Sequence, residues 1–85
     1  MPIMFCLWDP FTFGTTVFCQ DGDKKSSLFS GNFEEVCEYI AQEWQHGKYS
    51  KIILGGIGAD GMKERIRTYA ITNYNNFDIE IEVLK

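Results

Sequence analysis

The sequence predicts one small domain spanning residues 1–85, with a mixed five-stranded sheet and two helices, of α/β or α+β class. The runs Ile3 to Trp8 and Lys51 to Leu54 are short and apolar on both faces, which is typical of central strands. The β-branched and aromatic stretch Thr15 to Gln20 and the shorter Ser27 to Ser30 predict two more strands, joined by a turn as an antiparallel meander. The expected element order is β-β-β-α-β-α-β.

The first helix is predicted to begin after Asn32. Asn32 is a typical N-cap residue, and Glu35 three positions later completes a capping-box pattern. Apolar residues then recur with the helical period, at Phe33, Val36, Cys37, Ile40, Ala41 and Trp44. Gly47 is the expected stop, since glycine favours the position after a helix end.

The second helix is predicted to begin at Asp60, which we expect to cap it. Its apolar stripe consists of Met62, Ile66, Tyr69 and Ala70. The pair Asn75-Asn76 ends this helix. In the last stretch, Ile79, Ile81 and Val83 alternate with glutamates, so we expect an amphipathic edge strand.

The connections fix how these strands are arranged. A helix between two strands of one sheet makes a right-handed parallel crossover, and hairpins join antiparallel neighbours. The arrangement without crossing connections has the strand order 3-2-1-4-5, with strand 2 antiparallel to the others. Both crossovers run in the same direction, so both helices should lie on one face of the sheet.

Composition and charge narrow the possible functions. The net charge is −4 and the eight basic residues are scattered, which disfavours nucleic-acid binding. No apolar run approaches the roughly 20 residues of a membrane span. The three cysteines lie in apolar runs without metal-type spacing, and Met1 to Leu7 lacks the basic start of a signal peptide. These features predict a cytoplasmic protein without a metal or other cofactor.

The strand that ends in Asp9-Pro10, with Gly14 after a short turn and the next strand from Thr15 to Gln20, resembles the ribonuclease H-like superfamily. Within that superfamily the pattern resembles the RuvC-type resolvases. The following helix and the buried strand Lys51 to Leu54 come in the order that the resemblance implies. The order of strands and helices is similar over nearly the whole chain. The sequence motif that supports the resemblance consists of Asp9-Pro10 and Gly14.

The resemblance implies a nuclease that holds two Mg²⁺ ions with several carboxylates. Asp9 matches the acid that ends the first strand, but the fourth strand ends at Gly55-Gly56, where the family has its second acid. Asp60 is the remaining candidate, although it lies a turn further along. We therefore expect the resemblance to apply to the fold and not to the activity. A metal-dependent nuclease that uses Asp9 is the alternative function.

A glycine-rich loop offers a third interpretation. Gly56-Ile-Gly58-Ala-Asp-Gly61 matches G-x-G-x-x-G between a strand and a helix, and with Gly55 it could hold a phosphate or nucleotide on backbone amides. Asp60 within the loop would repel a phosphate, and no acid ends the next strand. A tight turn, in which Gly58 has a positive φ, explains the glycines as well.

The function that the sequence favours is a non-catalytic accessory or inhibitory protein, such as a phage or mobile element encodes. The aromatic residues Trp8, Phe11 and Phe13, near the end of the first strand, are its candidate contact residues. The helix-free face of the sheet should also carry apolar side chains, several hundred Å² in extent. We expect that face to meet a second copy of the chain or another protein.

Overall fold

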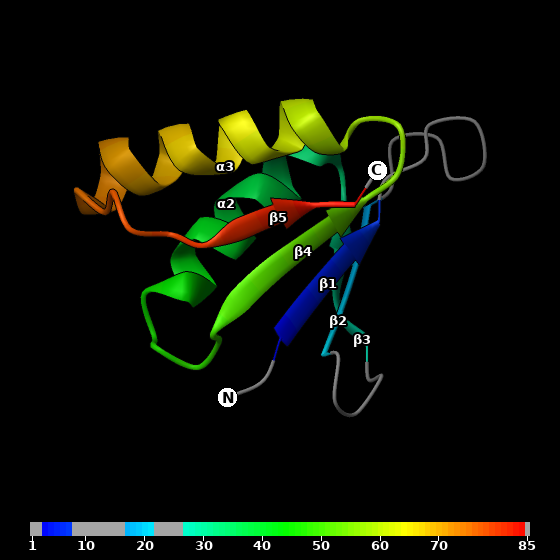
Figure 1. The fold of residues 1–85 in the computed structure, drawn as a ribbon, viewed down its shortest axis with the longest axis horizontal. Helices are drawn as coiled ribbons and strands as arrows, with labels where there is room; N and C mark the ends of the chain where they lie inside the picture. The colour runs from blue at the N-terminus through cyan, green and yellow to red at the C-terminus, as the bar shows by residue number, and fades with distance from the viewer. Residues whose placement is uncertain (1–2, 8–16, 22–26, 85) are drawn as a thin grey trace.

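The computed structural model describes residues 3–7, 17–21 and 27–84. In chain order these residues form β1 (Ile3–Leu7), β2 (Val17–Asp21), β3 (Ser27–Gly31), α2 (Phe33–Trp44), β4 (Lys51–Gly55), α3 (Ala59–Tyr74) and β5 (Ile81–Val83). Figure 1 shows the strands as one twisted layer with the two helices packed against it.

The sheet has the strand order β3-β2-β1-β4-β5. β2 pairs antiparallel with β1 and with β3, whereas β4 pairs in parallel with β1 and with β5. This pairing corrects the α/β part of the fold class. Only β1, β4 and β5 pair in parallel, and the first part of the chain is an antiparallel meander, so the fold is α+β.

Several element bounds differ from those expected. β2 is described from Val17 onward, and its predicted start at Thr15 lies outside the described residues. Its pairing with β3 shifts register between Cys19 and Gln20. β5 covers only three residues, but its hydrogen bonds reach further. The Ile52 N–H donates to the Glu80 carbonyl, and the Leu84 N–H donates to the Leu54 carbonyl, each at 2.9 Å.

The start of α2 has the capping box that the sequence predicts. The Glu35 N–H donates to Asn32 Oδ1 at 2.9 Å, and the Asn32 N–H donates to Glu35 Oε1 at 3.5 Å. Two of the amides that a helix start leaves without partners are therefore satisfied by side chains. Gly47 lies in the turn that follows α2 and has a φ of 71°, as the stop signal requires.

The start of α3 differs from the prediction. Gly58 is its N-cap and makes no side-chain cap, while Asp60 is the second residue of the helix, in its first turn. Asp60 therefore does not cap the helix, although a carboxylate in the first turn still suits the helix dipole. The predicted end at Asn75 is confirmed, since Asn75 has a left-handed backbone with φ 52°.

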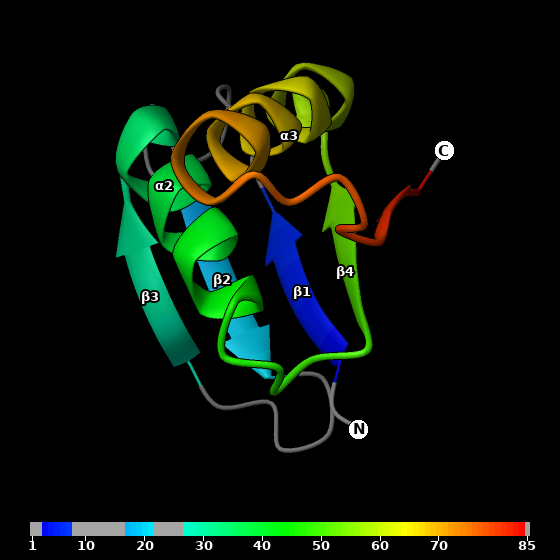
Figure 2. The same ribbon diagram turned by 90° about the vertical axis from the view of Figure 1, so that its left-hand side faces the viewer.

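The hydrophobic core lies on one face of the sheet, between the sheet and the helices. Both helices cover this same face (Figure 2). The strands contribute Met4, Cys6, Ile52 and Leu54 to the core, and the helices contribute Val36, Cys37, Ile40, Ala41, Ala59, Met62, Ile66 and Ala70. Among the described residues, no helix has the length and apolar character needed to cross a bilayer.

Candidate functional site

The sequence placed the candidate site at the carboxyl end of β1 and β4. The two strands are parallel neighbours, and Leu7 at the end of β1 lies opposite Gly55 at the end of β4. The carboxyl ends of β1 and β4 therefore lie side by side. Four predicted site residues, Asp9, Trp8, Phe11 and Phe13, lie outside the described residues.

The described part of this edge brings no second acid to the strand ends. β4 ends at Gly55, Gly56 follows it, and Asp60 is an exposed residue of the first turn of α3. Among the side chains that the structure describes, those of residues 3–7 and 31–84, no three His, Cys, Asp or Glu are placed to share a metal ion. A two-metal mechanism requires carboxylates on both sides of the scissile phosphate.

The glycines of the loop have different structural roles. Gly56 has a φ of 99°, which side-chain-bearing residues rarely adopt, whereas Gly58 has a φ of −91°. The expected positive φ is thus at Gly56 and not at Gly58. A Cβ on Gly61 would meet no atom within 4 Å, so its position does not require glycine. The turn is closed by a hydrogen bond in which the Ala59 N–H donates to the Gly56 carbonyl at 3.3 Å.

Sequence reasoning missed a cluster of polar side chains that joins the two helices. The Tyr69 hydroxyl donates a hydrogen bond to Glu34 Oε2, and Arg65 Nε donates to the same oxygen at 3.0 Å. The Arg65 guanidinium also lies 5.2 Å from the centre of the Tyr69 ring. No sequence signal pairs Glu34 with Arg65 or Tyr69, because Glu34 is more than 30 residues from either of them.

These contacts shift three ionisation equilibria. The hydrogen bond from Tyr69, followed by the one from Arg65, holds the pKa of Glu34 below its usual value. The hydrogen bond to Glu34 raises the pKa of Tyr69 to about 12, because ionised Tyr69 would lose its proton to donate and would face a carboxylate. The same carboxylate raises the pKa of Arg65. The cluster stabilises charged Glu34 and Arg65 with neutral Tyr69, and it joins α2 to α3.

The side of the sheet opposite the helices carries an apolar patch, which we call the helix-free patch. It consists of Ile3, Phe5, Leu7, Ile53 and Leu84. On β1, Phe5 is 36% exposed and Leu7 43%, while Leu84 after β5 is 54% exposed. A Cβ on Gly55 would lie 3.8 Å from Leu7 Cδ1 and 4.0 Å from Leu84 Cδ1, so these leucines flank the glycine on this face. The patch therefore extends from β1 across β4 to the residue that follows β5.

The sequence comparisons identify no relatives. No protein-family model matches the chain, and no curated protein matches it. The resemblance to ribonuclease H-like proteins remains a hypothesis that rests on Asp9-Pro10 and Gly14. The surfaces of the molecule are therefore the remaining indication of its function.

Proposed function

We propose that this protein is a non-catalytic protein-binding domain, of an accessory or inhibitory kind, that associates with a second copy of itself through the helix-free patch. The observation that carries the proposal is the exposure of Phe5, Leu7 and Leu84 on one face of the sheet. Large apolar side chains gathered on one exposed face mark an interaction surface in soluble proteins.

The form of the patch favours a second sheet as its cover. Side chains alternate along a strand, so the apolar residues of β1, β4 and the end of β5 stand on a single pleated surface. Two such surfaces can pack face to face at about 10 Å, with their side chains interdigitated, as in a β-sandwich. In a two-fold dimer both copies would supply the same patch, and the helices would remain on the outside.

Charges beside the patch are compatible with this self-association. Lys51 Nζ lies 3.7 Å from Glu82 Oε2, and both side chains are on the helix-free face. A two-fold axis through the patch brings one such pair from each copy to the rim. There each lysine can meet a glutamate of either copy, and exposed pairs of this kind contribute little to affinity but disfavour misaligned arrangements.

The test is light scattering coupled to gel filtration at micromolar concentrations, with two variants that replace an exposed apolar residue by lysine. Leu7→Lys changes the patch, whereas Ile71→Lys changes α3 at a position that is equally exposed, at 41%. We expect a mass of twice 9.8 kDa for the unmodified chain. We also expect a monomer for Leu7→Lys and an unchanged dimer for Ile71→Lys, because only Leu7→Lys puts a charge into the interface.

A folded wild-type monomer at every concentration tested would overturn self-association through the patch. A Leu7→Lys variant that remains dimeric would place the interface elsewhere. Circular dichroism of each variant shows whether it is folded. If Leu7→Lys fails to fold, Leu84→Lys provides the same test at a residue that lies outside the strands.

The absence of catalysis has its own support and its own test. The second acid expected of a ribonuclease H-like nuclease is replaced by Gly55 or Gly56 at the end of β4. Incubation with Mg²⁺ or Mn²⁺ should therefore produce no cleavage of RNA–DNA hybrids or four-way junctions. Metal-dependent cleavage that is lost in Asp9→Asn would instead support the nuclease alternative.

A further inference from the structure

β5 has one edge that is paired and one that is open. The Ile52 N–H donates to the Glu80 carbonyl and the Leu84 N–H donates to the Leu54 carbonyl. In a parallel ladder, alternate residues of a strand make all the hydrogen bonds to one neighbour. Residues 80, 82 and 84 therefore face β4, and the N–H and C=O groups of Ile81 and Val83 point away from the sheet. Within the described part of the chain, β5 is the last strand of the sheet and nothing pairs beyond it.

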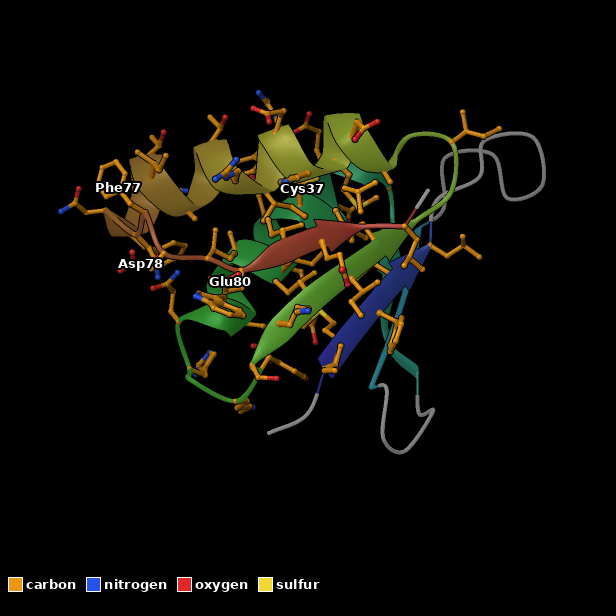
Figure 3. The ribbon with its side chains drawn as sticks, in the orientation of Figure 1. Cys37, Phe77, Asp78 and Glu80 are labelled. Carbon is orange, nitrogen blue, oxygen red and sulfur yellow. The ribbon has the colours of Figure 1, made fainter. Side chains whose placement is uncertain are left out.

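The side chains along this edge alternate between apolar and acidic residues. Ile79 is buried, and Ile81 and Val83 pack against the core on the side of the helices. The intervening positions are the exposed acids Asp78, Glu80 and Glu82, so acidic side chains follow the edge on the other side. Figure 3 shows Asp78 and Glu80 along the segment that leads from α3 into β5.

Most of this acidic charge is not neutralised by the described residues. Lys51 forms an ion pair with Glu82, and none of the described basic residues forms an ion pair with Asp78 or Glu80. Pairing of β5 with β5 of a second copy would place glutamates opposite or diagonal to glutamates, which is destabilising. The charges at this edge therefore disfavour a second copy and favour a basic strand.

We propose that the outer edge of β5 binds an extended segment of a different protein by strand addition. The segment fits if it carries Lys or Arg at alternate positions, which face Asp78, Glu80 and Glu82, and apolar residues at the positions between them. The outward N–H and C=O groups of Ile81 and Val83 supply the backbone hydrogen bonds, and the alternation of side chains supplies the selectivity. This inference rests on the proposed protein-binding function but uses a different surface from the helix-free patch.

The test uses two fluorescent peptides of the same composition, titrated by anisotropy at about 0.15 M salt, where long-range attraction is screened. In one peptide Lys and Val alternate, and in the other the lysines are grouped at one end. We expect the alternating peptide to bind at least about tenfold more tightly, because only its lysines stand on one side of an extended chain. Binding should also protect the Ile81 and Val83 amides from hydrogen exchange.

Three variants locate the site. Glu80→Lys should weaken binding of the alternating peptide by about tenfold or more, because it puts a like charge at the edge. Glu64→Lys makes the same charge change on the exposed face of α3 and should leave the affinity much closer to that of the wild type. Val83→Pro removes one outward N–H without removing a bond to β4, a change that edge strands tolerate, and should also weaken binding. Leu7→Lys should not affect binding, which separates this test from the test of the dimer.

Equal affinities for the two peptides, or equal losses in Glu80→Lys and Glu64→Lys, would reduce the effect to unspecific charge attraction and overturn the proposal. No binding of the alternating peptide at millimolar concentration would also overturn it. If Val83→Pro does not fold, the comparison of Glu80→Lys with Glu64→Lys decides the question alone. Amide protection at Ile81 and Val83 that depends on protein concentration without peptide would assign the edge to a second copy instead.

Discussion

The two faces of the sheet are built from similar residues but have different surroundings. On β1, Met4 and Cys6 point toward the helices and are 0% and 3% exposed, whereas Phe5 and Leu7 between them point to the other side and are 36% and 43% exposed. On β4 the buried Ile52 and the half-buried Ile53 repeat this contrast. An apolar side chain in a strand therefore does not by itself show which face of the sheet is covered.

The connections between the strands determine which face of the sheet the helices cover. Each right-handed crossover carries a helix, and both crossovers run the same way, so α2 and α3 lie on one face. On the opposite face the central strands also carry apolar residues, but no element of the described part of the chain packs over them. The difference between the faces can be measured as a difference in stability.

The largest expected effect comes from adjacent isoleucines of β4. At a concentration low enough to keep the chain monomeric, Ile52→Ala should lower the free energy of unfolding by about 2–5 kcal/mol, through lost burial and a cavity. Ile53→Ala should cost about 1 kcal/mol, since its side chain is only partly buried. Urea denaturation measures both values.

Equal losses for the two isoleucines at that concentration would show that both faces are covered, and the contrast would fail. A loss for Ile53→Ala that grows with protein concentration would instead support the dimer through the helix-free patch. If Ile52→Ala leaves too little folded protein, Ile52→Val and Ile53→Val give the same comparison at about 0.5–1.5 kcal/mol for the buried site.

A smaller effect on stability is expected from the capping box at the start of α2, one of the two helices that cover the sheet. Asn32→Ala removes the side-chain oxygen that accepts the Glu35 N–H and should cost about 0.5–2 kcal/mol. Asn73→Ala on the exposed side of α3 is the matched control and should leave the stability unchanged or slightly raise it, because alanine is the better helix former. Thermal unfolding of the two variants provides the comparison, and similar melting temperatures would show that the capping box contributes nothing.

The smallest effect is expected at the Glu34–Arg65–Tyr69 cluster on the exposed side of the helices. The pKa of Tyr69 is raised from 10.0 to about 12 in the folded protein, so its contribution is complete below pH 10 and disappears as the pH rises through 12. The pKa of Glu34 is lowered from 4.5, so its contribution is complete above pH 4.5 and disappears as the pH falls through the lowered value. The contact should therefore be fully formed between about pH 4.5 and 10.

A ¹³C NMR titration of the tyrosine rings measures this effect. In the wild type, Tyr69 should titrate at about 12, and in Glu34→Gln its pKa should fall toward 10 because the carboxylate is gone. A Tyr69 pKa that does not respond to Glu34→Gln would mean that the hydrogen bond does not form in solution.

Much of the covered side could be predicted from local patterns. The capping box at Asn32 and the end of α3 at Asn75 depend on a few neighbouring residues, and both are confirmed. The alternation at Ile79, Ile81 and Val83 predicted which side of that segment is buried. These patterns succeed because capping and periodicity depend on sequence neighbours.

The errors arose where local patterns do not determine the answer. Asp60 has the side chain of an N-cap, but Gly58 is the N-cap and the helix begins at Ala59, one residue before Asp60. Gly58 and Gly56 are both glycines of one loop, and sequence does not show which of them has the positive φ. The α/β class is wrong because it depends on how many strands pair in parallel, which is a property of the whole sheet that local patterns do not show.

The candidate site was predictable only as a location. Parallel pairing of β1 with β4 places Leu7 opposite Gly55, which defines the edge where a site could form. The Glu34–Arg65–Tyr69 contact joins residues far apart in the chain, and the open edge of β5 depends on which residues face β4. Both features need the three-dimensional arrangement, since neither has a sequence motif.

The buried thiols on the covered face can report how often the helices separate from the sheet. Cys6 lies in the sheet and Cys37 in α2, and both are buried, with Cys37 Sγ near the Met62 carbonyl oxygen at 4.0 Å. A thiol reagent can reach them only when the helical layer separates from the sheet, so the modification rate counts those separations. With Cys19 replaced by serine, equal rates at the two thiols would mean that the layers part in a single event. A faster rate at either thiol would identify the element that opens first.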